Sequence, residues 1–108
     1  MAECRRTWRQ FVAELREKFP GKKPIRVRRC QMPFDREVVP NMRLCGDCED
    51  KGDYFLIRIN RDHTLAMQKD TVIHEWAHYL KPYERGGSWH HEEWGKKHAE
   101  IYREMVGD

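Results

Sequence analysis

The sequence of 108 residues contains no apolar run that approaches the roughly 20 residues needed to cross a membrane. Its N-terminal segment, Met-Ala-Glu-Cys-Arg-Arg-Thr-Trp, also lacks the apolar stretch of a secretory signal. Internal repeats, low-complexity tracts and linkers are absent as well. These absences predict a single cytoplasmic domain over residues 1–108, a monomer without a membrane partner.

Cysteines are few, and they form only one close pair. The chain has four, of which Cys45 and Cys48 show the C-x-x-C spacing of half a zinc site. The other two, Cys4 and Cys30, lie far apart, so a site of four cysteines would need ligands from three separate elements. No βαβ pattern surrounds the close pair, which argues against a thioredoxin-like redox role. We therefore expect free thiols in a turn or at a strand edge.

An excess of charge of one sign is also missing. The formal net charge is only +3, and charged residues make up 36% of the chain beside 39% hydrophobic and 11% aromatic residues, a composition typical of a globular domain. Positive charge is concentrated near the first predicted strand, at Lys22, Lys23, Arg26, Arg28 and Arg29. A solvated strand face explains this concentration better than a nucleic-acid patch does, so nucleic acid is a weakly supported partner.

Hydrophobic periodicity divides the chain into helical and extended segments. The predicted elements are a helix over 5–19, a strand over 25–30, a hairpin of strands 42–45 and 54–60 around a turn at 50–53, a helix that starts after Asp62 or Thr64 and ends before Pro82, and a helix over 89–105. The buried face of the last helix is expected to comprise Trp94, His98, Ile101, Tyr102 and Met105. The pattern predicts an α+β fold, with an N-terminal helix, a small antiparallel or mixed sheet of about three strands, a helix packed on this sheet, and a C-terminal helix.

The helix before Pro82 carries the most informative motif, His74-Glu75-Trp76-Ala77-His78. One helical turn separates the two histidines, so both imidazoles project from one face and can hold a single Zn²⁺. Glu75, roughly 100° further round the helix, can reach a water on this metal as a general base. The apolar stripe of the same helix, which should pack on the sheet, comprises Val72, Ile73, Trp76, Ala77 and Leu80.

A catalytic zinc site needs a third protein ligand. The extended pattern H-E-x-x-H-x-x-G-x-x-H fails here, because its glycine falls on Lys81 and its last histidine on Glu84. The candidates that remain are Glu84, His90, His91, Glu92, Glu93 and His98. We favour His90, because it lies on the inward face of the last predicted helix, at its first turn. His98 lies two turns deeper and is expected to be a core or supporting residue.

Three segments together resemble the SprT-like (Spartan-type) zinc metallopeptidase domain over roughly residues 44–103. They are His74-Glu75-x-x-His78, then His90-His91-Glu92-Glu93-Trp94-Gly95, and then Ala99-x-Ile101-Tyr102-Arg103. The resemblance implies a compact α+β, zincin-like protease domain with zinc held by His74, His78 and His90. Larger members act on proteins attached to DNA and carry a further portion after the protease. This sequence looks more like the small stand-alone versions found in phage and bacterial genomes.

The predicted function is that of a zinc-dependent metallopeptidase acting on a protein or peptide substrate. Zinc would lower the pKa of its water toward ~7, and Glu75 would take the proton as this water attacks a peptide carbonyl. Tyr83 or Tyr102 could stabilise the oxyanion, and Asp70, one turn before His74, could orient that imidazole. Two alternatives stay open at this point. One is a zinc-stabilised binding module without turnover, and the other is a basic nucleic-acid-associated protein whose histidines bind no metal.

Overall fold

The computed structural model describes residues 6–33, 43–81 and 92–107, and it has the predicted α+β architecture. Its elements are α1 (Trp8–Lys18), β1 (Ile25–Cys30), β2 (Gly46–Asp50), β3 (Phe55–Asn60), α2 (Leu65–Leu80) and α3 (Glu92–Val106). Thr7 caps α1 through a capping box with Gln10, which explains why this helix begins later than the predicted residue 5. No helix in these described ranges is long and apolar enough to span a membrane.

The sheet is mixed, as one of the two predicted alternatives required. Its order is β1-β3-β2, in which β3 pairs in parallel with β1 and antiparallel with β2. The predicted hairpin is present, but its first strand was placed wrongly: β2 covers Gly46–Asp50, not residues 42–45. The segment 46–50 has glycine and two aspartates, which disfavour strands, so propensity pointed to the more apolar segment before it. The short turn between Asp50 and Phe55 decides which residues pair with β3, because a short turn brings the residues directly before the turn alongside the strand that follows.

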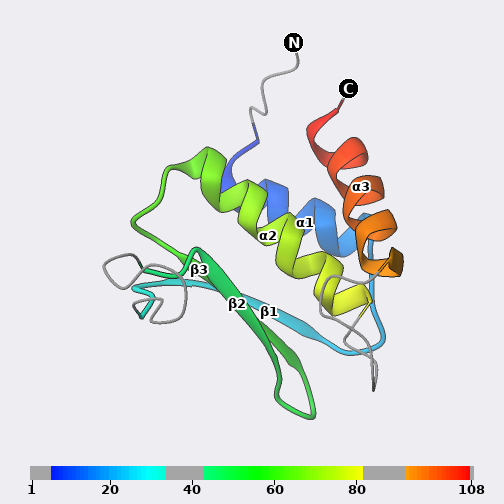
Figure 1. The fold of residues 1–108 in the computed structure, drawn as a ribbon, viewed down its shortest axis with the longest axis horizontal. Helices are drawn as coiled ribbons and strands as arrows, with labels where there is room; N and C mark the ends of the chain where they lie inside the picture. Colours follow the sequence, from blue (N-terminus) through cyan, green and yellow to red (C-terminus); the bar gives the residue numbers. More distant parts are fainter. Residues whose placement is uncertain (1–5, 34–42, 82–91, 108) are drawn as a thin grey trace.

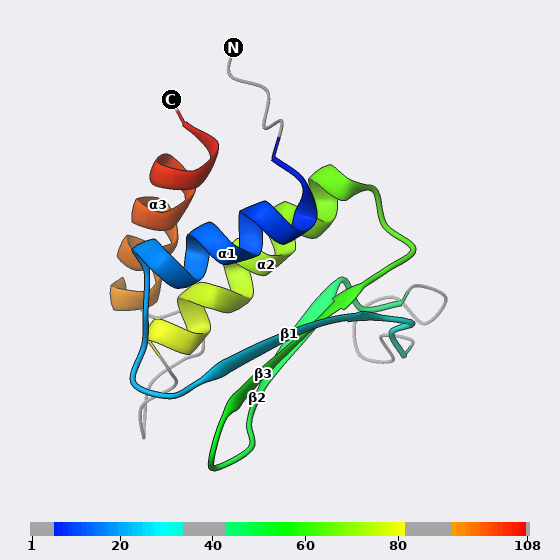
Figure 2. The same cartoon turned by 180° about the vertical axis from the view of Figure 1, so that it is seen from behind.

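Helix α2 is the centre of the molecule and contacts the sheet and both other helices. Figures 1 and 2 show all three helices on one side of the sheet. The buried side chains of β3 on this side are Phe55, Ile57 and Ile59, as predicted. The helices contribute Phe11, Leu15, Val72, Ile73, Trp76, Ala77, Ile101 and Met105 to the same core. No described helix covers the opposite face of the sheet, where Arg26 and Arg28 are exposed.

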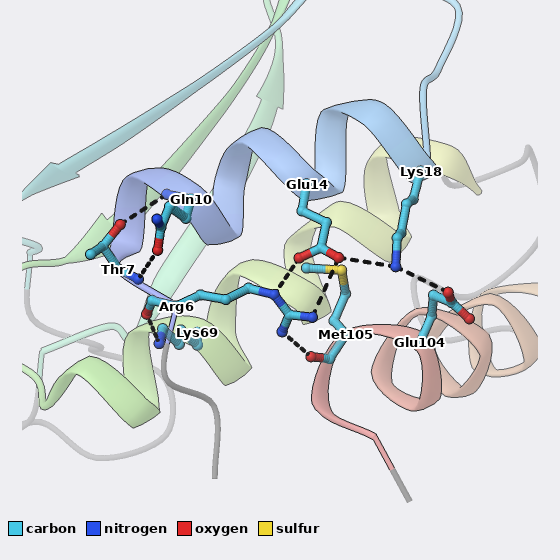
Figure 3. A network of polar contacts seen from close by, with 8 residues as sticks. All are labelled: Arg6, Thr7, Gln10, Glu14, Lys18, Lys69, Glu104 and Met105. Atoms are coloured by element: carbon cyan, nitrogen blue, oxygen red, sulfur yellow. Dashed lines mark hydrogen bonds and ion pairs between the residues drawn. The ribbon is translucent and has the colours of Figure 1, made fainter. Parts of the chain in front are cut away.

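A chain of polar contacts fixes α3 beside α1 (Figure 3). Arg6 donates to the carbonyl oxygen of Met105 over 2.7 Å and forms an ion pair with Glu14. Lys18 bridges Glu14 and Glu104 at 3.0 and 3.1 Å. These groups are exposed or partly exposed to solvent, so the ion pairs contribute little to stability. Their main consequence is positional, because they hold α3 where it can face α2.

Helix α3 does not bury the whole face predicted for it. Ile101 and Met105 are buried and Trp94 and His98 are half-buried, whereas Tyr102 is 41% exposed. The prediction for Tyr102 was wrong because the contact with α2 follows the row through Trp94, His98, Ile101 and Met105. A residue directly after Ile101 is turned roughly 100° away from this row.

Candidate metal centre

The turn between β3 and α2 sets where the motif helix begins. Asn60 is buried; its side chain donates to the Leu44 carbonyl oxygen over 3.1 Å and accepts from the Asp62 amide over 2.9 Å. Gln68 donates to the His63 carbonyl oxygen over 2.7 Å, and Thr64 caps the helix by accepting from the Met67 amide. Helix α2 therefore runs over Leu65–Leu80, which confirms the later of the two predicted starts, after Thr64, and the end predicted before Pro82.

The motif residues converge as their spacing predicted. The ligand atoms of His74, Glu75 and His78 all lie within 4.8 Å of one another, and the two imidazole centroids are 5.0 Å apart. Glu75 and His78 are only 7% and 5% exposed, while His74 is half-buried. Within the described part of the chain, this is the one group of three or more histidine, cysteine or acidic side chains gathered closely enough to hold a metal ion.

Packing of the hydrophobic core determines where His74, Glu75 and His78 lie. Val72, Ile73, Trp76 and Ala77 are fully buried against the sheet and α1, so the orientation of α2 about its axis is set by apolar packing. Leu80 of the predicted stripe is partly buried against the same core. The histidines then lie on the neighbouring face, toward α3.

Glu75 has an environment suited to a base that works near neutral pH. Burial is the main cause that raises the pKa of this carboxyl to about 7; the hydrogen bond from Cys48 lowers it and the charge of Asp47 raises it. Burial, followed by the nearby charge of Glu75, raises the pKa of the Cys48 thiol far above its ordinary value. Cys48 is the site residue that sequence reasoning missed. Only its C-x-x-C spacing with Cys45 had marked it, and that spacing suggested a different role.

Aromatic rings of α3 close one side of the metal centre. Trp94 stacks on His78 with centroids 5.1 Å apart and on His98 with centroids 5.0 Å apart. Its ring also meets His74 edge-on at 5.0 Å. His98 itself lies 6.0 Å from His74, and Tyr102 stacks on His98 at 6.3 Å. His98, expected to be a core or supporting residue, is thus half-buried beside Trp94.

The other candidate residues are distributed as follows. Asp70 is exposed on α2, one turn before His74, and Glu92 and Glu93 are exposed in the first turn of α3, where both pair with Lys96. His90, the predicted third ligand, lies outside the described residues, as do Tyr83, Glu84 and His91.

The donor set fits a zinc ion chemically. Two imidazoles one helical turn apart and an adjacent carboxylate are ligands and base of the kinds that zinc sites use. The low exposure of His78 and Glu75 would also shield a bound ion from water on the side of the core. Comparison of the chain with protein-family models, curated proteins and solved structures finds no match.

Proposed function

We propose that this chain is a zinc-dependent metallopeptidase of the SprT-like type, in which His74, His78 and His90 hold the metal and Glu75 is the general base. The observation that carries the proposal is the convergence of His74, Glu75 and His78 within 4.8 Å on a buried helix. When bound, zinc would polarise the peptide carbonyl and make water a stronger nucleophile at neutral pH.

Glu75 supports this assignment through its protonation behaviour. A carboxyl with a pKa of about 7 can both accept and return a proton near neutral pH, which peptide hydrolysis requires of a general base that later protonates the leaving amine. An ordinary, solvated glutamate would hold its proton too weakly for the second step. The oxyanion partner is Tyr83 or Tyr102, and Tyr102 lies one ring beyond His98 on α3.

Strand β2 supports a peptide as the substrate. It lies at the edge of the sheet, pairs only with β3 among the described strands, and contacts the motif helix. An extended peptide can add to such an edge through main-chain hydrogen bonds. The side chain of Cys48 on this strand is partly buried against the core beside α2, so a peptide on the edge would pass close to the motif helix.

The test is a comparison of wild type with Glu75→Gln, using an unfolded protein substrate and metal analysis of both preparations. We expect about one zinc per chain in each, and a loss of cleavage of at least roughly 100-fold in Glu75→Gln. Glu17→Gln is the matched control, because Glu17 is an exposed carboxylate on α1, outside both the candidate metal centre and the edge strand. Cleavage that persists in Glu75→Gln, or a wild type without bound metal, would rule the proposal out.

A second candidate function is favoured by the uncovered face of the sheet. Arg26 and Arg28 are exposed there and form no ion pair with any described residue, and Arg26 lies over the Tyr54 ring at 4.2 Å. Exposed arginines beside an aromatic ring suit a nucleic-acid strand. In this alternative, the metal centre stabilises a nucleic-acid-binding module without turnover.

A further inference from the structure

A cavity of about 710 Å³ lies at the end of the molecule where α1 and α2 end. Its described lining comes from all three helices, from the chain between α1 and β1 and from the turn ends of β2 and β3. In Figure 2 the last turns of α1 and α2 lie at the same end of the molecule as the first turns of α3. This volume is typical of small-ligand sites. Because the lining includes none of His74, Glu75 and His78, the cavity is separate from the metal centre.

Positive charge is concentrated around this cavity. Five of the eight lysines of the chain line it, whereas none of the described arginines does, although arginine is the commoner cation with thirteen residues. The five are Lys18, Lys22, Lys23, Lys81 and Lys97. The carboxylates in the described lining are only Asp50 and Glu100. The cavity therefore presents an excess of positive charge to its occupant.

Two of these lysines are available to a ligand. The other three form ion pairs within the fold, such as that of Lys23 with Asp50 at 2.6 Å. Lys22 and Lys81 form no ion pair with any carboxylate in the described part of the chain. Favourable placement of cations at helix C-termini does not explain the whole group, because Lys22 lies beyond the end of α1 and Lys97 lies in the second turn of α3.

One wall of the cavity is apolar and fixed by the fold. Tyr79 is 8% exposed, and its hydroxyl donates a hydrogen bond to the Lys23 carbonyl oxygen. A Cβ atom at Gly21 would collide with the Tyr79 ring, so the chain between α1 and β1 packs directly on this ring. Phe19 and Leu80 are half-buried in the same lining. The wall is therefore formed before any ligand binds.

We propose that this cavity binds a nucleoside phosphate, with the phosphates at Lys22 and Lys81 and the base against the apolar wall of Phe19, Tyr79 and Leu80. Lysine ammonium groups suit phosphate oxygens, whereas planar carboxylates are recognised best by the forked arginine side chain, which the described lining lacks. A flat base can pack on aromatic and apolar side chains. The bound anion also reduces the mutual repulsion of the lysines. This inference is independent of the proposed peptidase function.

The first test compares two probes, ATP and tripolyphosphate, with purified wild-type protein in magnesium-free buffer. Tripolyphosphate has the phosphate chain of ATP but no nucleoside. Calorimetric titration should show ATP binding about tenfold more tightly, because a base packed on the apolar wall adds affinity. Equal affinities would overturn the assignment of a nucleoside phosphate. So would the absence of saturable ATP binding up to about 1 mM.

The second test removes the two available cations. The double variant Lys22→Gln/Lys81→Gln should bind ATP at least roughly tenfold more weakly than wild type, because it loses charge-assisted hydrogen bonds to phosphate. The matched control Lys51→Gln/Lys96→Gln removes the same charge from two exposed lysines outside the cavity. It should stay within about twofold of wild type, since distant surface charges are screened. Equal weakening in both double variants would overturn the proposal.

The third test locates the bound ATP, because phosphate groups can also bind metal ions. His74→Ala removes one candidate metal ligand and should bind ATP as tightly as wild type. In backbone amide NMR spectra, ATP should shift the signals of residues 19–23 and 79–81. Loss of ATP binding in His74→Ala would place the ligand at the metal centre, and shifts confined to residues 26–28 would place it on the outer face of the sheet. Either result would overturn the proposal.

Discussion

The indole of Trp94 is stacked on the imidazole of His78, with ring centroids 5.1 Å apart and planes inclined by 26°. Trp94 comes from α3 and His78 from α2, so the contact that joins these helices is made partly by the candidate metal ligand itself. The packing of α3 on α2 and the orientation of the His78 imidazole therefore depend on the same contact.

The first prediction follows from this stacking. Trp94→Leu should weaken zinc binding about tenfold, because groups that orient a ligand typically contribute this much to metal affinity. Trp94→Phe, which keeps an aromatic face, should lose less. Affinity is measured by competition with a chromophoric chelator. Trp8→Leu is the control, since Trp8 is a half-buried tryptophan on α1, and an equal loss in this variant would show that the effect is general destabilisation.

The second prediction concerns stability and pH in metal-free protein. Folding raises the pKa of Glu75 from 4.5 to about 7, so between these values the folded chain binds more protons than the unfolded chain. The free energy of unfolding should consequently fall as pH rises from about 4.5 to 7, by on the order of 3 kcal/mol from this group.

Glu75→Gln isolates that contribution, because glutamine has nearly the same shape and does not titrate. Urea unfolding should show the two proteins equally stable near pH 4.5, and the variant more stable than wild type at pH 8. Identical pH profiles would mean that the Glu75 carboxyl is not desolvated by folding.

The third prediction compares two glycines. A Cβ atom at Gly46 would lie 2.7 Å from the Arg58 carbonyl oxygen and 2.7 Å from Cγ2 of Thr71, so β2 could not keep its present position against β3 and α2. Gly46→Ala should cost roughly 2–3 kcal/mol of stability. Gly95 of α3 has open space around the same position, and Gly95→Ala should stabilise by about 0.5–1 kcal/mol. Chemical denaturation of both variants checks the pair, and similar effects would contradict it.

The fourth prediction decides whether the arginine face binds nucleic acid. If it does, affinity for single-stranded DNA should fall steeply with salt, and replacing Arg26 and Arg28 by alanine should reduce the slope of log K against log salt by about 1.4. The control replaces Arg9 and Arg103, two exposed arginines on the helices. Equal losses in both double variants, or no binding by wild type, would remove the second candidate function.

Most of the fold was predicted correctly from the sequence, because the patterns that indicate it involve residues close together in the chain. Alternation in β3 and the apolar stripe of α2 are properties of neighbouring residues, and both faces were buried as expected. Errors arose where the deciding contact was distant. The start of β2 depends on pairing with β3, and the exposure of Tyr102 depends on which row of α3 meets α2.

The sequence by itself determined the spacing of His74, Glu75 and His78, because one helical turn fixes which side chains share a face regardless of what surrounds the helix. Tertiary structure alone decided that Glu75 is buried, which raises the pKa of its carboxyl, and that Trp94 covers His78. These contacts join residues of different elements, and no local periodicity indicates how the edge strand β2 and helix α3 pack against α2. The local sequence motif thus determined which kinds of groups form the candidate metal centre, whereas long-range packing determined their burial, protonation and orientation.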